Sequence, residues 1–95
     1  MTKEMFQAMV TRAECSDADS GRSALPDGRS MTLYLSRDGA SLQVSRVSEL
    51  KLDGGIIEAI DHKGELFMLA LADLFAASVT GGSKENPARK AGFLG

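Results

Sequence analysis

The chain has 95 residues, of which 43% are hydrophobic and 25% charged, and its formal net charge is −2. This length suits one domain with a single modest core, because two separate cores would each bury too little surface. The small negative charge gives the chain no general attraction for nucleic acid or for an anionic membrane. The longest apolar run falls far short of the roughly 20 residues that a membrane-spanning helix needs.

Cys15 is the only cysteine, so the sequence offers no intramolecular disulfide and no cysteine metal cluster. The N-terminal residues include Lys3 and Glu4 and lack the apolar run of a signal peptide. We therefore expect a cytoplasmic protein. His62, the only histidine, falls in a predicted turn, and no nucleophile, base and orienting group converge in the sequence. We expect no catalytic residue, no metal, no cofactor and no small-molecule substrate, and so not an enzyme.

Residues 2–14 are predicted to form an N-terminal amphipathic helix with Thr2 as a candidate N-cap. The apolar side chains recur at helical spacing and make one continuous face: Met5, Phe6, Met9, Val10 and Ala13. A helix of about 13 residues is marginal on its own, so it must pack on something. It either plugs the open end of the domain or docks a partner or a second copy.

Two polar segments flank the central part of the chain. Residues 15–30 are rich in Ser, Asp, Gly and Pro and are predicted to be a polar linker. Residues 81–95 are predicted to be a disordered basic tail, which opens with two glycines and shows no periodicity. In this tail Phe93 and Leu94 follow two basic residues, a pattern typical of a short peptide that anchors to a partner.

Residues 31–80 are predicted to form an antiparallel β meander. Glycine-containing turns at 37–39, 53–55 and 62–64 separate runs of β-branched and large apolar residues. The first strand covers 31–36, and the second begins near residue 41 with Leu42 and Val44 facing inward. The alternation then breaks, and a β-bulge at 46–48 would restore it. The third strand is expected at 56–60.

The segment 65–79 is ambiguous from its sequence. Its Leu, Met and Ala residues favour a helix, yet such a helix would be apolar on nearly every side. We favour a strand at 65–71, a tight turn at 72–74 and a last strand at 75–80. The alternative is four strands followed by a helix at about 66–79.

One helix, five short strands and a tight turn between the last two strands together resemble the Sm-like and SH3-like small β-barrels. The run Leu69–Phe75, Leu-Ala-Leu-Ala-Asp-Leu-Phe, resembles the strand–turn–strand closure of those barrels. The resemblance covers residues 2–80 and includes no family signature. It implies an α+β, mostly β fold in which 31–80 make a small barrel, and it selects no function.

We expect a non-enzymatic interaction or adaptor module that binds another protein or itself and does not bind a membrane. The candidate partner-binding residues are Met5, Phe6, Met9 and Val10 on the helix, and Phe93 and Leu94 in the tail. The alternative is a nucleic-acid-binding or nucleotide-binding barrel that uses Arg22, Arg29, Arg37 and Arg46. Neighbouring acidic residues offset the charge of these arginines, so nucleic acid is the less favoured partner.

Overall fold

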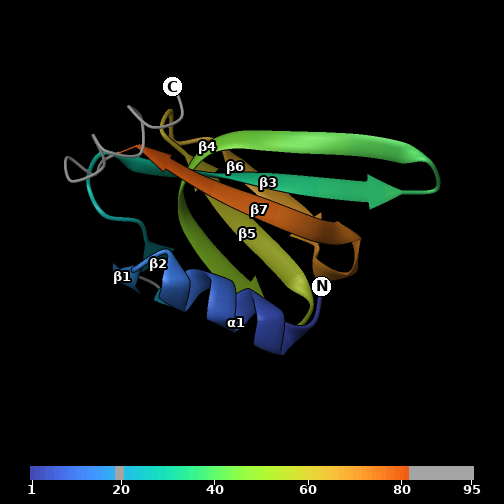
Figure 1. Ribbon diagram of the computed structural model, residues 1–95, viewed down its shortest axis with the longest axis horizontal. Helices are drawn as coiled ribbons and strands as arrows, with labels where there is room; N and C mark the ends of the chain where they lie inside the picture. The colour runs from blue at the N-terminus through green and yellow to red at the C-terminus, as the bar shows by residue number, and fades with distance from the viewer. Residues whose placement is uncertain (19–20, 82–95) are drawn as a thin grey trace, which may run out of the picture.

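The computed structural model describes residues 1–18 and 21–81. It is mostly β, with one N-terminal helix and a curled antiparallel sheet that makes a half-barrel (Figure 1), which confirms the predicted class at this level. The elements are α1 Lys3–Arg12, β1 Ser16–Asp17, β2 Ser23–Ala24, β3 Arg29–Arg37, β4 Ala40–Asp53, β5 Ile56–Asp61, β6 Leu66–Ala70, the 3-10 helix η2 Leu71–Asp73, and β7 Leu74–Gly81. The tail was predicted over 81–95; Gly81 ends β7 instead, and residues 82–95 fall outside the described residues.

The meander runs in the order β6-β5-β4-β3, and β7 returns to pair with the far side of β3. All of these pairings are antiparallel. Among the described residues β6 pairs only with β5, and β7 pairs only with β3. The curled sheet therefore ends in two strand edges that do not pair with each other.

Helix α1 begins at the predicted cap and ends two residues earlier than predicted, at Arg12. The Thr2 hydroxyl caps it by accepting a hydrogen bond from the Met5 amide at 3.1 Å. At the C-terminal end, the amide of Cys15 donates to the Val10 carbonyl and that of Glu14 to the Thr11 carbonyl. This is the Schellman arrangement, in which Glu14 takes the left-handed position with φ 63°.

The predicted bulge in the second strand is confirmed. Thr32 of β3 lies between the pairs Met31–Val47 and Leu33–Val44, so two residues of β4 oppose one of β3. One of these two, Arg46, has φ 60°. The extra residue brings Val47 into the core beside Val44, as the inward pattern required.

The predicted turns are also confirmed. Asp38 and Gly39 both have positive φ, as a two-residue hairpin turn with the right-handed twist of the flanking strands requires. In the turn after β5 the Gly64 amide donates to the Asp61 carbonyl at 2.9 Å, and Gly64 has φ 86°. The Asp61 carboxylate accepts from the amides of Lys63 and Glu65, which secures this turn.

Residues 66–81 form strand, 3-10 turn and strand, so the alternative of a C-terminal helix is wrong. Tertiary pairing decides this segment: β6 satisfies the backbone of β5, and β7 satisfies that of β3. The turn begins one residue earlier than predicted, at Leu71, whose amide donates to the Gly55 carbonyl at 2.9 Å.

The linker at 15–30 is not wholly a loop, which corrects the prediction. It contains β1 and β2, which pair with each other, and β2 pairs with β4 through Ser23–Leu50 and Ala24–Glu49. The distal half of β4 extends beyond its pairing with β3, and β2 supplies hydrogen-bonding partners there. Polar two-residue strands have no periodicity by which a sequence can reveal them.

The core lies between the concave side of the sheet and α1, which lies along the bottom of the sheet in Figure 1. Its completely buried side chains come from the three central strands: Met31, Leu33, Val47, Leu50, Ile57 and Ala59. No side chain with a charge or hydrogen-bonding group is buried among the described residues. No helix in the same ranges is long and apolar enough to cross a membrane.

Candidate functional site

The helix residues proposed for partner binding have different environments. Phe6 is 4% exposed and belongs to the core, and Met9 and Val10 are partly buried against it. Met5 is 57% exposed. Most of the apolar face of α1 is therefore occupied by the sheet, and Met5 is the member of the set that another molecule can contact freely.

Three of the four candidate arginines are engaged by carboxylates. Arg22 pairs with Glu58 of β5 at 3.8 Å, and Arg37 pairs with Asp73 of η2 at 3.0 Å. Arg29 contacts Glu14. An arginine whose charge is offset in this way contributes little to the attraction of a polyanion.

Arg46 differs from the other three arginines. It has no ion-pair partner within residues 1–18 and 21–81, and its side chain is exposed. It lines a hollow on the surface together with His62 and four hydroxyl-bearing residues. The structure thus singles out one candidate that the sequence could not distinguish from the rest.

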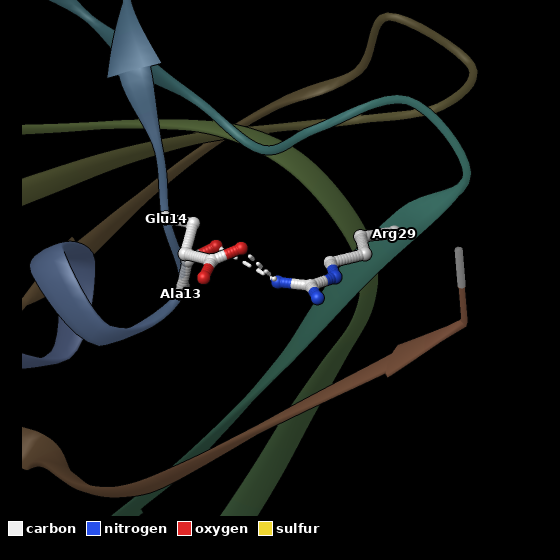
Figure 2. A network of polar contacts seen from close by, with 3 residues as sticks. All are labelled: Ala13, Glu14 and Arg29. Carbon is white, nitrogen blue, oxygen red and sulfur yellow. Dashed lines mark hydrogen bonds and ion pairs between the residues drawn. The ribbon is translucent and has the colours of Figure 1, made fainter. Parts of the chain in front are cut away.

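Arg29 secures the end of the helix (Figure 2). From the start of β3 its Nη1 donates to the Glu14 carboxylate at 3.2 Å and to the Ala13 carbonyl at 3.4 Å. A cation here complements the negative end of the helix dipole. These two contacts connect the C-terminal end of α1 to the start of β3.

We expect Arg29→Ala to lower the free energy of unfolding by about 1–2 kcal/mol, because it removes a charge-assisted hydrogen bond that is partly shielded from solvent. Urea denaturation followed by circular dichroism measures this. Arg12→Ala, at an exposed position of α1, is the control and should change the value by no more than about 0.5 kcal/mol. Equal effects of the two variants would show that the contact to the helix end contributes nothing.

A mainly apolar depression lies beside the turn end of the β3–β4 hairpin, and we call it the hairpin groove. Its volume is about 390 Å³. Its lining residues are Leu35, Ser36, Arg37, Ala40, Ser41, Leu42, Met68, Leu69, Ala70 and Asp73. Leu42 and Met68 are 54% and 65% exposed, so the groove presents apolar side chains to solvent. The Arg37–Asp73 ion pair lies at its margin.

A smaller hollow adjoins the groove at Leu42 and carries the apolar surface onto the outer face of the sheet. Phe75 lines this hollow with 62% of its surface exposed. Its ring lies 6.5 Å from that of Tyr34, centre to centre and tilted by 45°. The Tyr34 hydroxyl is 3.2 Å from Ser78 Oγ, which holds the tyrosine in place.

Leu42 corrects an inward prediction. It pairs with Leu35 and has the same inward phase as Val44, but it is mostly exposed. The hairpin extends past the other strands, as Figure 1 shows at its right-hand end, so no element covers its inner face there. The alternation of a strand gives the direction of a side chain and not what lies above it.

Cys15 is partly buried, and burial raises the pKa of its thiol. We expect iodoacetamide to alkylate it severalfold more slowly at pH 8 than it alkylates the urea-unfolded chain, because the thiolate is the reacting species. The raised pKa also predicts that the free energy of unfolding falls as the pH rises through the folded-state pKa of the thiol. Below the unfolded-state pKa of the thiol, its contribution to stability is fully present. Equal alkylation rates in the folded and unfolded chain would contradict this.

The described residues contain no group of three His, Cys, Asp or Glu side chains that could hold a metal ion. The tail anchors Phe93 and Leu94 lie outside the described ranges, and their role stays a prediction. Sequence reasoning overlooked Leu42, Met68 and Phe75. Each fits a strand pattern, and only the arrangement of β4, β6 and β7 in space shows that these exposed side chains line adjoining depressions.

Comparison of the chain with protein-family models, with curated protein sequences and with solved structures gives no significant match.

Proposed function

We propose that this chain is a non-enzymatic protein-interaction module: a small SH3-like or Sm-like barrel in the cytoplasm that binds another protein or a second copy of itself. The supporting observation is the hairpin groove. Leu42, Met68 and Phe75 are three of the most exposed large apolar side chains in the described residues, and they line the groove and the hollow adjoining it. Apolar surface gathered in a concave place is typical of sites that bind partner side chains.

The edge of the sheet beside the groove supports the same proposal. β6 is Leu-Phe-Met-Leu-Ala and contains neither a charged residue nor a proline. Edge strands of monomeric proteins usually carry such residues, which prevent pairing with other chains. An extended partner segment could hydrogen-bond to β6 while its side chains contact Leu42 and Met68.

The test is a double substitution, Leu42→Ser with Met68→Ser, in the full-length chain. Both side chains are more than half exposed, so the substitutions should leave folding intact. We expect the affinity for a captured partner, or for a second copy in analytical ultracentrifugation, to fall about 30-fold or more, as for interface hot spots.

Val79→Ser is the matched control, because Val79 is an exposed apolar residue of β7 outside both depressions. Phe93→Ala with Leu94→Ala tests the tail in parallel. Nuclease-treated lysate excludes capture through nucleic acid. Capture and self-association that are unchanged by the groove substitutions would overturn the groove as the site, and loss only in the tail variant would move the site to residues 93–94.

A further inference from the structure

A second depression lies on the outer face of the sheet, and it differs in chemistry from the hairpin groove. Its volume is about 480 Å³. We call it the polar hollow, and its lining residues are Ser30, Thr32, Ser45, Arg46, His62 and Thr80. They come from β3, β4, β7 and the turn after β5. Among the lining residues within 1–18 and 21–81 there is no acidic side chain and no Phe or Tyr ring.

The bulge of β4 places the cationic side chain of Arg46 at this hollow. Arg46 is one of the two β4 residues that oppose Thr32, and its φ of 60° is a conformation that favours glycine. The amide of His62 donates to the Arg46 carbonyl at 3.0 Å, which fixes the imidazole-bearing turn next to the bulge. The bulge and the turn after β5 therefore place Arg46 and His62 next to each other at this hollow.

The hydroxyls are ordered by strand pairing. Ser30 and Thr80 are directly opposite each other in β3 and β7, with their oxygens 3.5 Å apart. Thr32 follows two residues after Ser30 and so points to the same side of the sheet. Asp61 precedes His62 in the chain, and its carboxylate accepts hydrogen bonds from two backbone amides of the same turn.

We propose that the polar hollow binds a small phosphorylated polyol, such as a sugar phosphate. The guanidinium of Arg46 can donate two parallel hydrogen bonds to a phosphate, and His62 can donate a third. Hydroxyls both donate and accept, which suits the hydroxyls of a sugar. The described part of the lining offers no Phe or Tyr ring on which a nucleobase could stack, and the volume lies within the range of small-ligand sites.

The test is an NMR titration of the ¹⁵N-labelled full-length chain with ribose 5-phosphate, inorganic phosphate and ribose, at constant ionic strength. We expect saturable shifts at the amides of Arg46, His62 and Thr80, with ribose 5-phosphate binding more tightly than phosphate and ribose producing no shift. Arg46→Gln should weaken the binding at least about tenfold. Arg12→Gln removes the same charge from the helix and should leave it unchanged.

Arg46→Gly removes the side chain in the conformation that glycine prefers, so its melting temperature should be equal to or above that of the unaltered chain while binding is lost. The groove variant Leu42→Ser with Met68→Ser should bind the sugar phosphate normally, which separates this site from the proposed interaction surface. Non-saturable shifts, or an equal loss in Arg12→Gln, would show general charge attraction and overturn the proposal. Tighter binding of a single-stranded oligonucleotide than of ribose 5-phosphate would also overturn it.

Discussion

Replacing Phe6 by alanine should lower the free energy of unfolding by about 3–5 kcal/mol, which approaches the whole stability of many domains of this size. Phe6 is 4% exposed and is the only α1 residue within Lys3–Arg12 that is fully buried. The substitution removes its contacts with the core and leaves a cavity that the rigid sheet cannot fill. Urea denaturation followed by circular dichroism measures the change.

Met5→Ala is the matched control, because Met5 precedes Phe6 on the same helix and is mostly exposed. We expect it to alter stability by no more than about 0.5 kcal/mol. A large loss for Phe6→Ala with a small one for Met5→Ala would establish that α1 is part of the core. Two small losses would mean that α1 can leave the sheet, and its apolar face would then be available to a partner.

Replacing Gly81 by alanine should destabilise the chain by about 2–3 kcal/mol, because it combines backbone strain with overlap. Gly81 has φ 83° and pairs with Arg29 at the start of β3. A Cβ placed on it would lie 2.6 Å from the Gly28 carbonyl oxygen, which is backbone and cannot rotate away. We expect the Arg29–Gly81 end of the β3–β7 pairing to open, and faster amide exchange at Ser30 and Thr80 measures it.

Gly39→Ala separates the two causes. Gly39 also has φ 83°, but no heavy atom lies within 4 Å of the position a Cβ would take. It should therefore cost only the strain of a left-handed alanine, about 1 kcal/mol. If both glycine variants lower the free energy of unfolding equally, the close approach of the Gly28 carbonyl to Gly81 does not contribute to the loss.

Ligand binding at the polar hollow bears on the same end of the sheet. Thr80 lines the hollow and adjoins Gly81, so opening of this pairing should weaken sugar phosphate binding as well. By linkage, a ligand that binds only the closed form should slow amide exchange there.

The sequence by itself determined the local structure of this protein, because turns, caps and alternation depend on neighbouring residues. Thr2 capped the helix, glycines closed the predicted turns, and the broken alternation after Val44 located the bulge. The alternation also indicated the inward side of the second strand at Val44, which is buried.

Only the tertiary structure decided how far each element is covered and which charges meet. Residues 66–81 form strands because their backbone groups pair with those of β5 and β3. The short strand β2 within 15–30 pairs with the part of β4 that β3 does not reach. Leu42 follows an inward pattern yet is exposed, because the β3–β4 hairpin extends past the strands that cover the core. Among four arginines with similar sequence surroundings, Arg46 was distinguished by long-range contacts that engage the other three, and no local pattern encodes such contacts.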